Sequence, residues 1–145
     1  MRRIAVRAII VDGNKLLLAR LNSSTSNTSN EYYCTIGGGL DDNEGLIDGL
    51  KREVLEETGV IAKVGKLLCV QQYKDKHDNI EFFFYITNGR DFRDIALSKT
   101  THGQQEISEI GFYDPTNIHV LPQFISETSV LELLNTTDVR FYNYL

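Results

Sequence analysis

The feature that most constrains this chain is a glycine-rich and acidic segment at residues 38–60, which reads GGLDDNEGLIDGLKREVLEETGV. Within it, Glu53 precedes Glu56 by three residues and Glu57 by four. In an α-helix this spacing puts all three carboxylates on one face, within a few ångströms of one another. Like charges held so close repel by roughly 0.2–0.5 kcal/mol per pair. A divalent cation would offset that repulsion, and hard cations such as Mg²⁺ take oxygen ligands and act beside substrate phosphates.

The residues before these glutamates predict a sharp turn that leads into a helix. Consecutive glycines at residues 37–39 allow the backbone to turn where side chains would obstruct it, so that a carbonyl group can point inward. Asp41, Asp42 and Asn43 follow, and these residue types favour helix N-caps and turns. We therefore expect the helix to begin near Asn43 or Glu44.

The apolar residues of the segment predict which side of the helix is buried. They recur at helical spacing and form one stripe: Leu46, Leu50 and Val54, with Ile47 and Leu55 beside them. Gly49 weakens the middle of the helix by about 0.5–1 kcal/mol relative to Ala, and its lack of a side chain would permit close packing there. Gly59 is placed to end the helix in a left-handed conformation.

The whole segment resembles the signature of the Nudix hydrolases. That signature is a glycine, five residues, a glutamate, seven residues and then Arg-Glu-apolar-x-Glu-Glu-x-Gly-apolar, and every position from Gly38 to Val60 matches it. A solvated acidic helix face would explain the charges, but it would explain neither the flanking glycines nor Arg52. The resemblance implies an α/β sandwich around a mixed β-sheet. It also implies Mg²⁺-dependent hydrolysis of a nucleoside diphosphate linked to another moiety, with Mn²⁺ as an alternative metal.

Carried onto this chain, the resemblance implies a metal site and a catalytic set. The metal ligands are the carboxylates of Glu53, Glu56 and Glu57 and the carbonyl group of Gly38. Glu53 also has the position of a general base. Arg52 is expected to orient the carboxylates through charge-assisted hydrogen bonds rather than to contact substrate.

Two further acidic positions complete the predicted site. Glu44 either holds Arg52 or lies behind the metal ligands and supports them. Members of the family often supply one more acidic residue from a loop late in the sheet, and here the candidates are Glu106 and Glu109. We favour Glu106, as both a metal ligand and a catalytic residue, because it begins a predicted strand where a loop meets the site.

Substrate choice is predicted partly by elimination. Family members that act on ADP-ribose, on diadenosine polyphosphates or on coenzyme A carry further motifs, which this chain does not match. A MutT-like nucleoside triphosphate pyrophosphohydrolase is therefore favoured. The alternatives are a hydrolase of nucleotide sugars, dinucleotides or capped RNA, and a non-catalytic nucleotide-sensing module. Four aromatic residues are candidates for stacking on a base, although strand residues of this kind also serve as core: Tyr32, Tyr33, Phe83 and Phe112.

Length and charge narrow the class of protein. The 145 residues suit one domain, residues 1–145, with its own hydrophobic core. A net charge of −5 argues against duplex nucleic acid as a partner, because phosphate backbones need a basic surface. The sequence has neither a membrane span nor a clear export signal. We therefore expect a cytoplasmic protein. The resemblance to Nudix hydrolases implies that it acts on a small nucleotide, and it leaves a homodimer open because many relatives dimerise.

The remaining elements are predicted from periodicity and turn residues. Strands are expected at residues 3–11, 15–21, 32–36, 63–73, 80–87 and 106–113, with a terminal helix at 123–134 and a final edge strand at 139–145. Residues 12–14 read Asp-Gly-Asn, which is typical of a hairpin turn. Residues 22–30 contain only Ser, Thr and Asn and predict a loop, and residues 88–105, which have no clear period, predict another.

Overall fold

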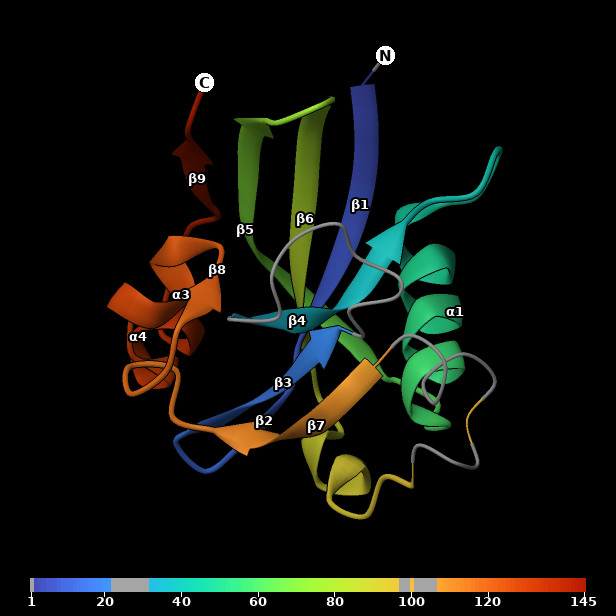
Figure 1. Cartoon of the computed structure of the whole chain (residues 1–145), viewed down its shortest axis with the longest axis vertical. Helices are drawn as coiled ribbons and strands as arrows, with labels where there is room; N and C mark the ends of the chain where they lie inside the picture. The colour runs from blue at the N-terminus through green and yellow to red at the C-terminus, as the bar shows by residue number, and fades with distance from the viewer. Residues whose placement is uncertain (1, 22–31, 97–99, 101–106) are drawn as a thin grey trace.

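A mixed β-sheet occupies the centre of the computed structural model, which describes residues 2–21, 32–96, 100 and 107–145 (Figure 1). Its strands are β1 (Arg2–Ile9), β2 (Val11–Asp12), β3 (Lys15–Leu21), β4 (Tyr33–Gly39), β5 (Val64–Lys74), β6 (Asp78–Ile86), β7 (Ile107–Tyr113), β8 (Val120–Leu121) and β9 (Arg140–Asn143). The helices are α1 (Leu46–Thr58), the 3₁₀ helix η1 (Gly89–Phe92), α3 (Gln123–Glu127) and α4 (Val130–Leu134).

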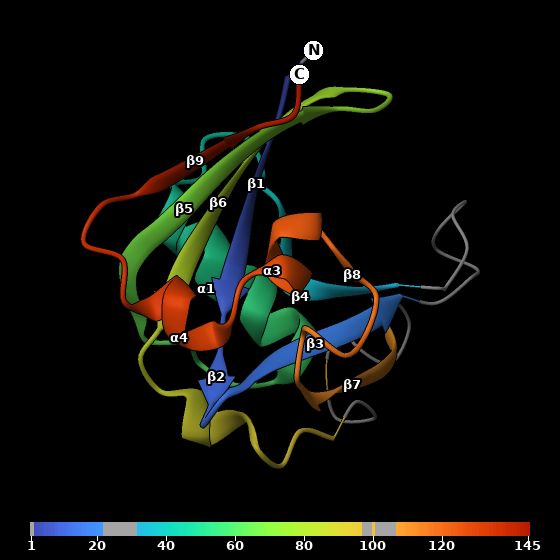
Figure 2. The same cartoon turned by 90° about the vertical axis from the view of Figure 1, so that its left-hand side faces the viewer.

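The strands of the described residues join in the order β2-β3-β4-β1-β6-β5-β9. Strand β1 runs antiparallel to β4 and parallel to β6, so the sheet is mixed as predicted. Strand β4 pairs with β3 as well as with β1, and it thereby joins β2 and β3 to the rest of the sheet. Strand β7 pairs with β3, and β8 pairs with β4. The final strand β9 lies parallel to β5 at the edge, which confirms the predicted edge strand (Figure 2).

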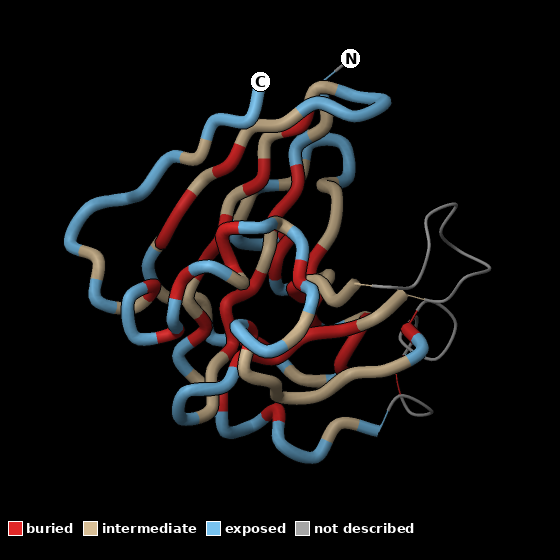
Figure 3. The backbone as a smooth tube through the Cα atoms, turned by 60° about the vertical axis from the view of Figure 1, so that its left-hand side comes forward, coloured by how far each residue is buried: buried red, intermediate tan, exposed pale blue. Residues whose placement is uncertain are grey.

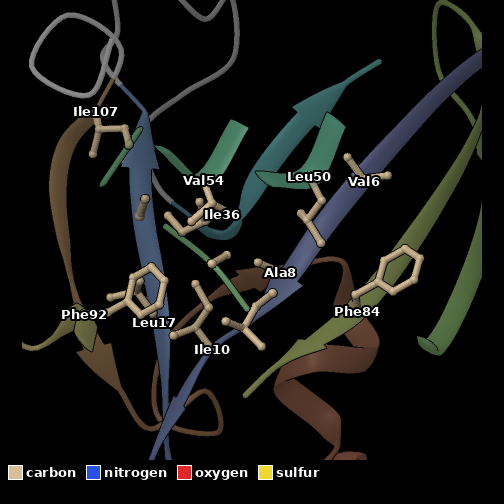
Figure 4. Close-up of a cluster of buried hydrophobic side chains, with 13 residues drawn as sticks. Val6, Ala8, Ile10, Leu17, Ile36, Leu50, Val54, Phe84, Phe92 and Ile107 are labelled. Atoms are coloured by element: carbon tan, nitrogen blue, oxygen red, sulfur yellow. The ribbon is translucent and has the colours of Figure 1, made fainter. Parts of the chain in front are cut away.

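Helices cover both faces of the sheet because the strand residues alternate in direction. Ala8 on β1 and Ile10 just after it face the cluster that contains Leu50 and Val54 of α1, shown in Figure 4. Ile9, between them, faces a second cluster that α3 and α4 build with residues such as Phe124. In Figure 3 the buried stretches follow the central strands, whereas many of the connecting turns are exposed. The structure therefore confirms the predicted α/β sandwich.

Several boundaries differ from the sequence-based expectation. The strand predicted at residues 3–11 is divided into β1 and β2, and the predicted hairpin follows, with Gly13 at a φ of 63°. The helix predicted at residues 123–134 is two short helices. They separate because Ser129 begins α4 as its N-cap, where its side chain accepts a hydrogen bond from the Glu132 backbone N–H at 3.2 Å.

The loop predicted at residues 22–30 lies outside the described residues, while the other predicted loop, at residues 88–105, contains the helix η1. Within the described residues, no helix combines the length and the apolar character that a bilayer crossing requires.

Candidate active site

The glycine turn at the end of β4 lets the helix carboxylates approach the sheet. Gly37 has a φ of 144°, and a Cβ atom there would overlap the carbonyl oxygen of Val6 on the neighbouring strand β1. A Cβ at Gly38 would lie 2.8 Å from the carboxyl group of Glu53. Glycine is required at Gly37 by backbone conformation and close approach. At Gly38 the missing side chain leaves the space that the Glu53 carboxylate occupies.

The entry to α1 differs from the prediction. We expected the helix to begin near Asn43 or Glu44, but it begins at Leu46, and Gly45 is an N-cap without a side-chain hydrogen bond. Asn43 has a φ of 64°, which is left-handed and cannot belong to a right-handed helix. The Glu44 carboxylate turns back to accept a hydrogen bond from the backbone N–H of Asp41 at 3.0 Å. The acidic residues before the helix therefore form a turn instead of its first residues.

The buried stripe of α1 is narrower than predicted. Leu50 and Val54 are fully buried, and Leu46 packs against the same cluster. Ile47 and Leu55, which the sequence predicts beside the stripe, are 47% and 45% exposed. At the other end, Gly59 stops the helix at a φ of 76°, as predicted, with its N–H donating to the Leu55 carbonyl.

Arg52, in the middle of α1, donates hydrogen bonds to several carboxylates. Its Nε and Nη2 atoms donate to both oxygens of Glu44, at 2.7 and 2.9 Å. Its Nη1 donates to Glu53 and to Glu56, each at 3.1 Å, and its Nη2 also reaches the Gly39 carbonyl at 3.3 Å. The guanidinium holds the pKa of Glu44 at about 2, below its ordinary value. Of the two alternatives for Glu44, the structure thus shows a bidentate contact with Arg52.

The three helix glutamates lie in different surroundings. Glu53 and Glu56 share the Arg52 guanidinium, and burial raises the pKa of Glu53 although Arg52 opposes the change. Glu57 is 7% exposed and accepts a hydrogen bond from the Gly37 backbone N–H at 3.0 Å. Glu57 therefore ties the end of α1 to the glycine turn, while Glu53 and Glu56 line the helix face that bears Arg52.

This set of groups fits a hard divalent cation. The donors are carboxylate and carbonyl oxygens, which Mg²⁺ prefers, and the space at Gly38 admits the Glu53 carboxylate. No three acidic, histidine or cysteine side chains in the described ranges already converge as a set of metal ligands. Instead, Arg52 Nη1 bridges Glu53 and Glu56. A metal that bound both carboxylates would have to compete with that guanidinium.

Of the two acidic candidates late in the sheet, Glu106 and Glu109, the structure describes Glu109 alone. Glu106, the favoured candidate, is not among the described residues. Glu109 lies on β7, where its carboxylate accepts hydrogen bonds from the hydroxyl groups of Tyr33 (3.1 Å) and Tyr113. The Tyr113 hydrogen bond, more than any other contact, lowers the pKa of Glu109. The two tyrosines therefore engage both oxygens of Glu109.

Of the four aromatic candidates for base stacking, only Tyr32 lines a cavity of about 440 Å³ found among the described residues. Tyr33 packs on Tyr113, with ring centroids 4.9 Å apart. Phe83 has no exposed surface and meets Phe124 edge-on, so it offers no face to a base. Phe112 packs against the cluster on the α1 side of the sheet. The placement of Tyr33, Phe83 and Phe112 is that of packing residues.

A buried polar network that the sequence patterns did not predict lies beneath this cavity. Arg7 Nε donates to Glu81 at 3.1 Å, and Arg7 Nη1 donates to the carbonyl groups of Thr35 (3.1 Å) and Gly37 (3.3 Å). Gln71 Nε2 donates to the other Glu81 oxygen at 2.5 Å. A local signal did exist, because Arg7 and Glu81 are charged residues inside the otherwise apolar runs at residues 4–11 and 80–86, where unpaired charges would be costly.

Comparison with known proteins identifies the family. A model of the NUDIX domain matches residues 1–134. A MutT protein from Methanosarcina mazei Go1 superposes with a TM-score of 0.67 at 23% identity, covering 87% of this chain and 88% of that chain. A MutT protein from Bacillus halodurans gives 0.68 at 17% identity, with 98% and 90% covered. A MutT NUDIX hydrolase from Burkholderia pseudomallei gives 0.66 at 19% identity, with 94% and 99% covered. Since these structures establish the shared fold and the family model spans nearly the whole chain, the chain belongs to the NUDIX family of pyrophosphohydrolases.

Proposed function

We propose that this chain is a Mg²⁺-dependent, MutT-like nucleoside triphosphate pyrophosphohydrolase, which releases a nucleoside monophosphate and pyrophosphate. One observation supports this more than any other. The Arg7 guanidinium, which lines the cavity, donates to the carbonyl group of Gly37, and the N–H of the same Gly37 donates to Glu57. A cavity within the usual size range of small-molecule sites thus adjoins the carboxylates of the family signature. A nucleotide could place its base in the cavity and its phosphates near the glutamates.

The metal-binding groups in this proposal are Glu53, Glu56, Glu57, the Gly38 carbonyl and Glu106. A bound Mg²⁺ or Mn²⁺ would neutralise charge on the phosphate oxygens and lower the pKa of a water molecule. Glu53 acts as the general base, the role that its position in the family signature implies, and the space beside Gly38 holds its carboxylate against the glycine turn. Glu56 and Glu106 complete the proposed catalytic set.

Arg52 acts in this proposal as a positioning residue. Its bidentate contact with Glu44 fixes the guanidinium plane, from which Nη1 reaches Glu53 and Glu56. Such fork-shaped contacts restrict direction as well as distance. The acidic chain, with its net charge of −5, would depend on metal ions to attract a polyphosphate. We also propose that the enzyme works in the cytoplasm on small nucleotides.

A substrate panel with Mg²⁺ tests this function. The purified chain is incubated with nucleoside triphosphates, dinucleotides, nucleotide sugars and capped RNA, and the products are separated by chromatography. Release of pyrophosphate and monophosphate from a triphosphate supports the proposal. Turnover of another class alone would assign a different Nudix chemistry, and silence across the panel would favour a nucleotide-sensing module.

Glu57→Gln tests the carboxylate site within the same assay. The amide oxygen can still accept the Gly37 hydrogen bond, so the fold should persist, while Mg²⁺-dependent turnover should fall by far more than about tenfold. Glu132→Gln, an exposed change on α4, is the matched control and should leave turnover unchanged. A Glu57→Gln protein that keeps a tenth or more of the wild-type rate would contradict the assignment.

A further inference from the structure

The cavity beside the glycine turn has a polar side formed by the central strands. Thr35, Gln71 and Glu81 come from β4, β5 and β6, and each is nearly inaccessible to solvent, at 2–3% exposure. Tyr32 and Pro122 border the cavity from outside these strands. An apolar pocket with a few fixed polar groups is typical of a small-molecule site, because the polar groups decide orientation and selectivity.

The Thr35 hydroxyl provides the first sign that a ligand completes this cavity. Its Oγ1 atom is buried and has no hydrogen-bond partner among the described residues. Buried polar atoms without partners are rare in native proteins, since the hydroxyl loses its bonds to water without replacing them. A ligand group in the cavity would supply the missing partner, and a hydroxyl can either donate or accept.

The Glu81 carboxylate provides the second sign that a ligand binds in this cavity. One of its oxygens accepts from Arg7 and the other from Gln71, so the group is held in place and its charge is balanced by the guanidinium. Each carboxylate oxygen can accept a further hydrogen bond. The side chain is 4% exposed and lines the cavity. Glu81 therefore presents a fixed acceptor to any ligand there.

The Gln71 amide cannot exchange its hydrogen-bond donor and acceptor to suit a ligand. Its amide N–H is bound to Glu81, and reversing the amide would bring the Gln71 oxygen against a carboxylate oxygen. The amide therefore keeps one N–H and one carbonyl oxygen in defined positions for other partners. Together, Glu81 and Gln71 give the cavity a hydrogen-bonding pattern that is set before a ligand arrives.

We propose that this cavity selects nucleobases that carry an exocyclic amino group, with Glu81 accepting from the amino group and Thr35 bonding a neighbouring polar atom of the base. The proposal deepens the proposed function by naming the bases its substrate would carry. An amino group on cytosine, adenine or guanine donates to Glu81. In uracil or hypoxanthine a carbonyl oxygen or a hydrogen atom stands at that position, and the oxygen would face the carboxylate as acceptor against acceptor. A buried polar group left unpaired in this way discriminates strongly between ligands.

Pairs of nucleoside monophosphates that differ by one group test the selectivity. Dissociation constants are measured by calorimetry for CMP against UMP, AMP against IMP, and GMP against IMP, without metal. In each pair where binding is detected, the amino-bearing nucleotide is expected to bind at least roughly tenfold more tightly. Equal affinities, a preference for the partner without the amino group, or no binding by any nucleotide would overturn the proposal.

Thr35→Val tests whether the base occupies the cavity. Because the hydroxyl has no partner among the described residues, its removal should leave the thermal midpoint of unfolding unchanged or raised. Affinity for the preferred monophosphate should fall roughly tenfold. Thr128→Val, at a buried threonine that is not among the residues lining the cavity, is the control and should not alter affinity. Unchanged affinity in a folded Thr35→Val protein would contradict the inference.

Glu81→Gln is the direct test of the acceptor, but it leaves Arg7 without its counter-charge and can unfold the chain. Thr35→Val and the nucleotide pairs keep the inference testable in that event. Binding of monophosphates requires no catalysis, so this result is independent of the hydrolysis assay. Selective binding without turnover would keep the base preference and reject the proposed activity, whereas turnover without selectivity would do the reverse.

Discussion

Arg52 and Glu44 are joined by two parallel hydrogen bonds of 2.7 and 2.9 Å, which link the turn before α1 to the middle of the helix. A planar guanidinium makes this fork with a carboxylate, whereas a lysine ammonium is a point charge. The same guanidinium also contacts Glu53 and Glu56. The pair thus sets where two of the proposed metal ligands stand.

Arg52→Lys should therefore impair turnover more than it impairs folding. We expect kcat to fall roughly 10–100-fold, the range for groups that orient metal ligands, and the Mg²⁺ concentration for half-maximal rate to change. Arg93→Lys is the matched control, because Arg93 makes a similar two-bond contact with Asp12 on an exposed surface. Equal effects of the two variants on Mg²⁺ dependence would argue against a positioning role for Arg52.

The Glu44–Arg52 contact should also make stability depend on pH. The pKa of Glu44 is lowered from 4.5 to about 2, chiefly by the hydrogen bond from Arg52. A group whose pKa is lower in the folded state stabilises the fold above its unfolded pKa and loses that contribution as the pH falls through its folded pKa. The stabilisation should therefore be complete above pH 4.5 and should decline towards pH 2.

Urea unfolding of the wild type and Glu44→Gln at a series of pH values measures this effect. The wild type should have the higher midpoint near neutral pH, and the two midpoints should converge as the pH falls from about 4.5 towards 2. A difference that stayed constant over this range would show that Glu44 stabilises the chain through its shape and not through its charge.

At Gly49, helix propensity and side-chain packing predict opposite effects of an alanine substitution. In an open helix, Gly→Ala would stabilise the protein by about 0.5–1 kcal/mol. Here a Cβ would overlap the Leu40 side chain and would lie 2.9 Å from a Glu44 oxygen. Gly49→Ala should therefore destabilise the chain, by about 1–3 kcal/mol. Gly45→Ser is the control, since nothing lies within 4 Å of a Cβ there and serine is a good N-cap.

Chemical denaturation of both glycine variants distinguishes the two effects by sign. Gly45→Ser should leave the free energy of unfolding unchanged or slightly raised, while Gly49→Ala lowers it. A stabilised Gly49→Ala protein would mean that Leu40 and Glu44 move aside at little cost.

Local patterns predicted the parts of the fold that depend on neighbouring residues. Gly59 ends α1 with a left-handed φ, because a glycine after a helical period carries that information in the sequence itself. The stripe of α1 was predicted correctly at its centre, at Leu50 and Val54, but not at its margins, where Ile47 and Leu55 are exposed. Periodicity gives the direction of a helix face, whereas its width depends on which strands lie opposite.

The parts that were missed depend on pairing between distant segments. Arg7 and Glu81 are 74 residues apart and meet because β1 and β6 pair in parallel. No local pattern gives that register. The predicted start of the helix was wrong for a related reason, since Asn43 takes a left-handed φ while Glu44 is held by Arg52. A cap propensity describes isolated helices, and here a contact across the turn outweighs it.

Gly38 and Gly39 provide a final test, because they are adjacent but face different neighbours. A Cβ at Gly38 would lie 2.8 Å from the Glu53 carboxyl group, whereas at Gly39 it would lie 3.5 Å from Arg3 Nε, an ordinary contact. Neither residue has a positive φ, so alanine fits both backbones. Gly38→Ala should keep the wild-type unfolding midpoint, since the flexible Glu53 side chain can swing away, but displacing a general base by about 1 Å can cost roughly 100-fold in rate. Gly39→Ala should retain most activity. Loss of activity in both variants, or in neither, would show that the space beside Gly38 does not position Glu53 for catalysis.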